Sequence, residues 1–163
     1  MDVRSLGIPG VKLITPRRFE DSRGFFQQNY HRNEYRDAGI DTNFIQDNWS
    51  RSSRGILRGL HCQALFPQAK LVSVVRGAVF DVAVDLRKDS PTFGRWVGAE
   101  LSEENGCQLF IPRGFAHGFL VLSDIVDFFY KCDEFYHPED DCGIRWNDPQ
   151  IGIKWPDVGT DYV

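Results

Sequence analysis

His61 is the side chain of this sequence best placed for proton transfer. It lies in residues 55–63, GILRGLHCQ, where apolar residues surround it, Arg58 stands three positions earlier and Gly59 two. Histidine is the one residue whose ordinary pKa lets it both accept and release protons near neutral pH. A β-type segment can hold such an imidazole rigidly beside a cation. The segment alone leaves two alternatives open, a structural histidine and a general base.

The spacing of Arg58 and His61 raises a question of strand geometry. Residues three positions apart point to opposite faces of a regular strand. A bulge at Gly59 would turn both side chains toward the same interior. Without a bulge, Arg58 would lie at the mouth of the pocket.

A tyrosine and a second histidine are the next candidates for acid–base chemistry. Tyr130 lies in the strand-like run FFYK, and a phenol held opposite a base can donate a proton. The alternative role for Tyr130 is a core tyrosine. His117 lies in PRGFAHGF, where Asp81 could orient its ring, since carboxylates often orient imidazoles. Tyr136 could offer a ring for stacking.

Several polar side chains are candidates for binding an anionic sugar derivative. Arginine and lysine bind diphosphates through charged hydrogen bonds, and a compact amide–carboxylate cluster can bind hydroxyls or the edge of a base. Each is also common as an ordinary surface or turn residue. The candidates are Arg23, Arg58, Lys70, Gln46, Asp47 and Asn48.

A metal site is the weaker hypothesis. The metal signature of cupins places H-x-H and a later glutamate close together, whereas here the sequence reads His61-Cys-Gln63. The two other histidines, His31 and His137, lie in segments that look solvent-facing. The four cysteines form no C-x-x-C pair and have poor spacing for zinc.

Short β-type runs separated by turn signals must position these residues. We expect one helix, over residues 31–38, stopped at Gly39. In residues 78–86, Asp81 and Asp85 share one face, which suits a pocket lining or a wet surface, and an interior placement requires partners. Strands this numerous predict an antiparallel sandwich or barrel. The predicted strands are residues 11–15, 25–30, 44–48, 70–75, 78–86, 95–101, 108–111, 118–122 and 125–135.

Length and composition narrow the class of protein. A chain of 163 residues with 42% hydrophobic and 26% charged residues predicts one globular domain over residues 1–163. The net charge of -4 disfavours a nucleic-acid surface. No apolar run approaches a membrane span and the first residues lack a secretory signal, so we expect a cytoplasmic protein with reduced, buried cysteines.

Nine blocks of the sequence together resemble the dTDP-4-dehydrorhamnose 3,5-epimerase family. Their order and spacing, from about residue 11 to residue 156, carry the resemblance. The blocks are DSRGFF at 21–26, QDN at 46–48, LRGLHCQ at 57–63, KLV at 70–72, DVAVDLR at 81–87, SPTFG at 90–94, residues 111–119, YKC at 130–132 and IRWNDP at 144–149.

The resemblance implies an all-β, cupin-type antiparallel jelly roll, a homodimer, and no metal or organic cofactor. It also implies a dTDP-4-keto-6-deoxyhexose substrate inverted at C3 and C5. His61 matches the base that removes the C–H proton, Tyr130 the donor that returns a proton to the opposite ring face, and Lys70 a cation near the enolate oxygen. The positions that match substrate contacts are Arg23, Gln28, Gln46, Asp47, Asn48, Arg58, His117, Tyr136 and Asp141.

Three features depart from the family pattern. Gln28 and Asp141 stand where the family commonly has glutamate. The family usually continues past the W-P motif into an S-x-K-D segment whose aspartate supports the base, whereas the printed sequence ends at Val163. Asp161 is a candidate for that supporting role.

Three other functions stay open. An epimerase of this kind can invert only one carbon. A cupin-type module can bind a nucleotide sugar without catalysis, which a missing partner for His61 would favour. A metal-dependent cupin enzyme is the third alternative.

Overall fold

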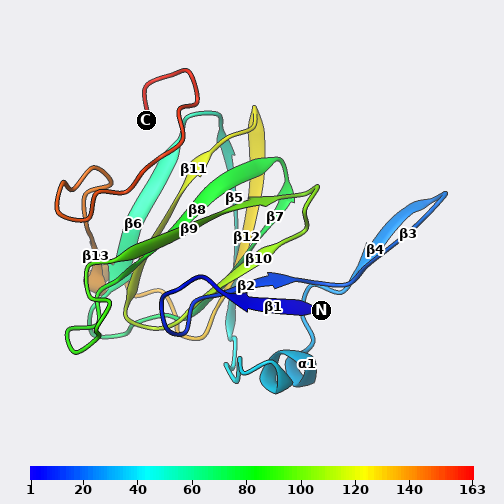
Figure 1. The fold of residues 1–163 in the computed structure, drawn as a ribbon, viewed down its shortest axis with the longest axis horizontal. Coiled ribbons are helices and arrows are strands. Elements are labelled where there is room, and N and C mark those ends of the chain that lie inside the picture. The colour runs from blue at the N-terminus through cyan, green and yellow to red at the C-terminus, as the bar shows by residue number, and fades with distance from the viewer.

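The computed structural model describes residues 1–163 and contains two antiparallel sheets packed face to face (Figure 1). The six-stranded sheet has the order β1 (Asp2–Ser5), β2 (Lys12–Thr15), β10 (Gln108–Ile111), β7 (Lys70–Arg76), β12 (Ile125–Cys132) and β5 (Gln46–Ser53). The five-stranded sheet has the order β13 (Asp141–Gly143), β6 (Leu57–Gln63), β11 (Phe115–Val121), β8 (Ala78–Asp85) and β9 (Trp96–Ser102).

The main core lies between the two sheets. Fifteen buried apolar residues form it, among them Val72 and Phe128 from the six-stranded sheet and Val79 and Phe119 from the five-stranded sheet. Alternation along each strand sends every second side chain inward. The sheets are thereby held at the separation that these side chains fill.

Each sheet is also covered on its outer face. The helix α1 (Arg32–Asp37) contributes Tyr35 to a buried cluster on the six-stranded sheet with Leu71 and Phe110. Residues of the C-terminal segment, including Ile151 and Trp155, pack on the outer face of the five-stranded sheet. A 3₁₀ turn (Pro138–Asp140) precedes β13.

A two-stranded hairpin projects from the body of the molecule (Figure 1). It consists of β3 (Arg18–Asp21) and β4 (Gly24–Gln27). Its side chains Phe19, Phe25 and Phe26 are 60%, 61% and 66% exposed. Exposed apolar surface of this kind marks an interaction site more often than a solvated loop.

The predicted all-β architecture with few short helices is confirmed. The helix prediction is confirmed within one residue at each end, since α1 has His31 as its N-cap and Ala38 as its C-cap. The sequence left open whether the shared face of Asp81 and Asp85 lies in the interior or in solvent. It lies in the interior, because both residues are fully buried. Asp85 has the partners that burial requires, namely Arg87, Ser90 and Thr92.

The cysteines are free, as expected, but they are not all buried. Cys132 is buried, Cys62 and Cys107 are half-buried, and Cys142 is exposed. The prediction of burial was wrong for Cys142 because β13 is a short edge strand with solvent beside it. None of the helices has the length and hydropathy of a membrane span.

Candidate active site

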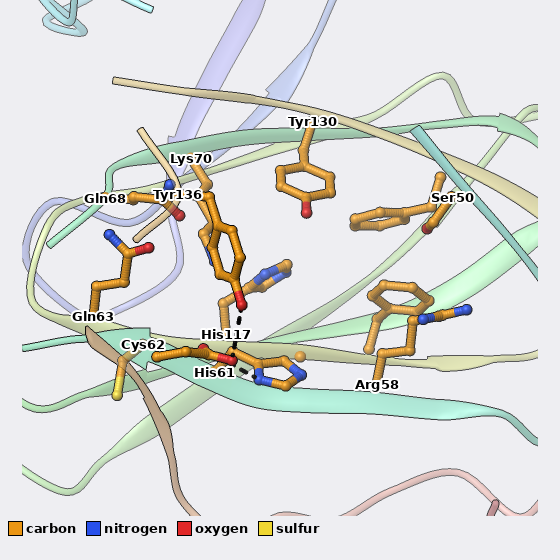
Figure 2. A pocket seen from close by; sticks show the side chains of 14 residues that line it. Ser50, Arg58, His61, Cys62, Gln63, Gln68, Lys70, His117, Tyr130 and Tyr136 are labelled. Atoms are coloured by element: carbon orange, nitrogen blue, oxygen red, sulfur yellow. Dashed lines mark hydrogen bonds and ion pairs between the residues drawn. The ribbon is translucent and has the colours of Figure 1, made fainter. Parts of the chain in front are cut away.

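A cavity of about 250 Å³ opens between the two sheets and contains the predicted reactive residues (Figure 2). One wall comes from β6 and β11, and the other from β7 and β12. Tyr130 and His61 lie on opposite sides of the cavity in Figure 2, with the tyrosine hydroxyl pointing into it. The predicted residues brought together here are Arg58, His61, Lys70, His117, Tyr130, Tyr136 and Asp141.

A bulge in β6 places Arg58 and His61 on the same cavity, which is one of the two arrangements that the sequence left open. His61 pairs with His117 of β11, whereas Arg58 pairs with Phe119, so two residues of β6 oppose the single Gly118. Gly59 has φ of 110°. This conformation favours glycine, and the bulge shifts the alternation of the strand.

His61 has a carboxylate beside its ring nitrogen. Its Nδ1 lies 3.8 Å from Oδ1 of Asp141, and the Tyr136 hydroxyl donates to Oδ2 of Asp141 at 3.3 Å. Burial lowers the pKa of His61, Asp141 opposes that shift, and Lys70 adds to it. The imidazole is therefore biased toward the neutral form that accepts protons.

The predicted role of Asp161 as the partner of His61 is not what the structure shows. Asp161 lies beside Gly55, where the C-terminal residues run along the start of β6: the Leu57 amide donates to the Val163 carbonyl. The carboxylate that reaches His61 comes from β13, which pairs with β6 in the register Gly143 to His61.

His117 is oriented by Asp81, as the sequence predicted. The distance from His117 Nε2 to Asp81 Oδ2 is 2.9 Å, and both residues are buried. Burial raises the pKa of Asp81, and His117 opposes that shift. No group of three or more His, Cys, Asp or Glu side chains is arranged to hold a metal ion.

Lys70 and Tyr130 form the opposite wall. The Lys70 Nζ lies 5.9 Å from the centre of the Tyr130 ring. Burial lowers the pKa of Lys70, while Cys132 and Asp81 oppose that shift. Burial raises the pKa of Tyr130, so its phenol retains its proton at neutral pH.

The 46–48 cluster lies on β5 outside the wall of the cavity. The Gln46 side chain accepts from the Tyr136 amide at 3.0 Å, which ties the cluster to one of the cavity residues. Asp47 pairs with Lys131 at 2.9 Å, and Asn48 donates to the Cys132 sulfur at 3.8 Å.

Arg23 and Gln28 are the two predicted contacts that lie far from the cavity in sequence and in the fold. Arg23 is at the tip of the β3–β4 hairpin, 87% exposed, and forms an ion pair with Asp21 at 2.6 Å. Gln28 follows β4 and donates to Glu34 at 3.2 Å. Neither lines the cavity of its own chain.

Comparisons with known proteins show the family of this chain. The family described as dTDP-4-dehydrorhamnose 3,5-epimerase matches residues 5–162. The chain belongs to this family. The epimerase of that name from Methanothermobacter thermautotrophicus is 54% identical over 149 residues, which cover 91% of this chain and 80% of the relative.

Solved structures of epimerases have the same fold. The dTDP-6-deoxy-D-glucose-3,5-epimerase of Legionella pneumophila, crystallised with dTDP-4-keto-L-rhamnose, superposes with a TM-score of 0.96 at 50% identity. The match covers 99% of this chain and 86% of that one. A dTDP-4-dehydrorhamnose 3-epimerase of Streptomyces niveus is more distant, at 42% identity over all of this chain and 79% of its own. This chain is thus an isomerase of the epimerase family, with a cupin-type jelly roll.

Polar residues that the sequence did not single out also line this epimerase site. Ser50 and Gln63 are two of them (Figure 2). Alternation offered a signal for each, because Ser50 is two residues from Asn48 and Gln63 two residues from His61. Gln63 also donates to the Phe66 carbonyl at 2.6 Å and accepts from the His137 amide at 2.9 Å, which shapes the floor around Tyr136.

Proposed function

We propose that this epimerase inverts C3 and C5 of a dTDP-4-keto-6-deoxyhexose, with His61 as the base and Tyr130 as the proton donor. One observation carries the proposal: His61 and Tyr130 face the same cavity from opposite sheets, and burial lowers the pKa of His61 and raises the pKa of Tyr130. A base on one side of a sugar ring and an acid on the other are what inversion at carbon requires.

The proposed step is a proton transfer through an enolate. The 4-keto group acidifies the hydrogens at C3 and C5. His61 takes one of these protons, and the electrons of the C–H bond move into the ring to leave negative charge on the C4 oxygen. The Lys70 ammonium stabilises that charge. Tyr130 gives its proton to the opposite face of the carbon, and exchange with water resets both side chains.

The charged and aromatic groups around the cavity support binding of the nucleotide. Arg58 donates to Ser52 through Nε at 2.9 Å, which leaves its terminal nitrogens for a phosphate oxygen. Tyr136 is 52% exposed and offers a ring face for the base, with Gln46 holding its backbone. Base stacking of this kind contributes about 1–3 kcal/mol.

A homodimer accounts for the position of Arg23 and Gln28. The hairpin that carries Arg23 projects from the body and exposes three phenylalanines, which favours a partner on that surface (Figure 1). We place Arg23 at the cavity of a second copy, where it adds a cation for the diphosphate. The four free thiols favour the reducing cytoplasm as the compartment.

Hydrogen exchange with solvent tests the proposed chemistry. The protein is incubated with dTDP-4-keto-6-deoxyglucose in deuterated water, and C3 and C5 are followed by NMR. We expect deuterium at both carbons, and His61→Ala lowers the rate at both by at least about a hundredfold. His31→Ala is the matched control, because His31 caps α1 away from the cavity. Undiminished exchange in His61→Ala would remove His61 as the base.

Tyr130→Phe separates proton removal from inversion. Without the phenol, His61 still removes a proton and returns a deuteron to the same face, so we expect labelled but uninverted sugar. Tyr162→Phe is the control, since the Tyr162 hydroxyl donates to the Pro156 carbonyl away from the cavity. Equal loss of exchange and inversion in Tyr130→Phe would contradict a role limited to donation.

The same assay decides among the alternatives. Exchange at one carbon favours a single-carbon epimerase, the activity named for the Streptomyces niveus relative. Retained binding of the nucleotide sugar with no exchange favours a binding module. The 3,5-epimerases at 54% and 50% identity favour inversion at both carbons.

A further inference from the structure

Two cysteines lie against each other across the outermost strand pair of the five-stranded sheet. Cys62 of β6 and Cys142 of β13 are direct partners in the register, although 80 positions separate them in the chain. Their sulfur atoms are 2.9 Å apart, and the Cys142 thiol also lies 3.2 Å from the Cys62 carbonyl oxygen.

Cys62 belongs to the wall of the cavity, but its sulfur lies on the far side of that wall. The Cys62 side chain points away from the cavity in Figure 2 and packs with the outer cluster that contains Leu60 and Ile144. Its neighbour His61 lines the cavity. The two cysteines are thus one residue along from His61 on β6 and from Asp141 on β13.

The strand geometry suits a disulfide without backbone rearrangement. Opposed residues of an antiparallel pair have Cα atoms about 4.5–5.5 Å apart. Disulfides span Cα separations of about 4.4–6.8 Å. The remaining thiols have other neighbours: Cys107 contacts Thr15 at 3.6 Å, and Cys132 is buried beside Asn48.

We propose that Cys62 and Cys142 are a reversible oxidation site that forms an intrachain disulfide with a low-molecular-weight disulfide as oxidant. The exposed Cys142 reacts first: its thiolate attacks one sulfur of the oxidant and releases one small thiolate. Cys62 then loses its proton to water, and its thiolate attacks the Cys142 sulfur and releases the second small thiolate. Two protein thiols and one small disulfide become one protein disulfide and two small thiols.

The order of attack follows from the surroundings of the two sulfurs. Burial and the contact with Cys142 raise the pKa of Cys62 to about 12, so its thiolate is scarce at neutral pH. Cys142 lies on the exposed edge strand, where an oxidant can reach it. The attack of Cys62 on the Cys142 sulfur is therefore the slower step, and its rate increases at alkaline pH.

The Cys62–Cys142 disulfide would link β13 covalently to β6. β13 is only three residues long, and all three are exposed. A cross-link between strands this far apart in sequence removes conformational freedom from the unfolded chain and stabilises the fold. The inference concerns the fold and the thiols, and it stands whether or not the proposed function is correct.

Thiol mapping of the intact chain tests the proposal. Reduced protein is treated with oxidised glutathione, the free thiols are alkylated after unfolding, and peptides are identified by mass spectrometry. We expect Cys107 and Cys132 to be alkylated and a peptide to join Cys62 to Cys142. The melting temperature rises by about 5 °C and returns to its starting value with dithiothreitol.

Two single substitutions sharpen the result, one of them a control. Cys62→Ser leaves Cys142 as a lasting mixed disulfide with one glutathione, whereas Cys107→Ser forms the same cross-link as the parent. Circular dichroism of each reduced variant confirms that it is folded. Four free thiols after oxidation, a link through Cys107 or Cys132, or a bond between two chains would overturn the proposal, and a linked protein with an unchanged melting temperature would overturn the pinning of β13.

Discussion

Charged neighbours act on the base candidate His61 in opposite directions. Burial is the largest influence and lowers its pKa, Asp141 raises it, and Lys70 and Arg58 lower it. The net shift is downward. A base with a lowered pKa stays unprotonated further into the acid range, so the acid limb of kcat/KM is expected below the ordinary histidine value of about 6.5.

Asp141→Asn tests the carboxylate beside His61. The substitution removes the one charge that raises the pKa of His61, so we expect the acid limb of the kcat/KM profile to move to lower pH. Loss of the orienting contact lowers kcat by about tenfold.

Asp141→Glu is the conservative control. It keeps the negative charge, so we expect the acid limb of its kcat/KM profile not to move to lower pH. The measurement is the full pH profile of inversion for the three proteins. A kcat loss in Asp141→Asn with an unmoved acid limb would mean that Asp141 has only a structural role.

At the scale of elements, the bulge in β6 decides where two functional side chains point. A Cβ at Gly59 would lie 2.6 Å from the His117 carbonyl oxygen and 2.7 Å from the Gly118 Cα. These are backbone atoms of the neighbouring strand, so no side-chain movement relieves the clash. The positive φ of Gly59 adds backbone strain for any other residue.

Gly59→Ala should therefore cost about 3 kcal/mol of unfolding free energy and misplace His61. Gly94→Ala is the matched control, because Gly94 has φ of 74° and a Cβ there would meet no atom within 4 Å. We expect about 1 kcal/mol for Gly94→Ala, with activity retained. Urea unfolding and the exchange assay measure both; equal costs for the two variants would show that close packing at the bulge matters little.

Local patterns predicted most of the strands and the helix but not the pairing that completes the site. Strand alternation placed Lys70 on a face with Val72, and Gly59 offered the bulge that brings Arg58 and His61 together as one of two possible arrangements. The contact of Asp141 with His61 depends on β13 pairing with β6, and no local signal connects residues 80 positions apart. The β3 half of the hairpin was missed because RFED is a mostly polar segment whose exposed strand has no buried face.

At the scale of the whole molecule, the packing of a single chain does not explain why the β3–β4 hairpin projects and exposes apolar side chains. Its three exposed phenylalanines line one surface hollow together with Arg23, which the family resemblance assigns to substrate binding. Its reach away from the body suits contact with another copy (Figure 1).

A double substitution of hairpin residues tests the dimer. Phe25→Asp with Phe26→Asp places two charges on the proposed interface, so we expect a monomer by light scattering. Phe93→Asp is the control, since Phe93 is 56% exposed on a loop outside the hairpin. A dimer that survives the hairpin substitutions would place the interface elsewhere.

Mixing a variant with weakened substrate binding and a variant that lacks the proposed base tests whether Arg23 acts on the second copy. Arg23→Ala is expected to raise KM by about tenfold, and His61→Ala is expected to abolish exchange. In a hybrid dimer, one cavity regains His61 from one chain and Arg23 from the other. We expect the mixture to recover a low KM, whereas an Arg23 that serves its own cavity would give no recovery.

The two walls of the cavity belong to different sheets, so the distance between the proposed base and the proposed acid depends on the spacing of the sheets. His61 belongs to the five-stranded sheet and Tyr130 to the six-stranded sheet. Core side chains such as Val72 and Phe119 fill the space between the two sheets beside the cavity. We expect a change of core volume there to alter which carbon of a sugar ring fits between the proposed base and the proposed acid, with both groups intact. Enzymes that invert two carbons and enzymes that invert one can thus diverge through substitutions in the apolar core. A comparison of catalytic residues alone would not detect such substitutions.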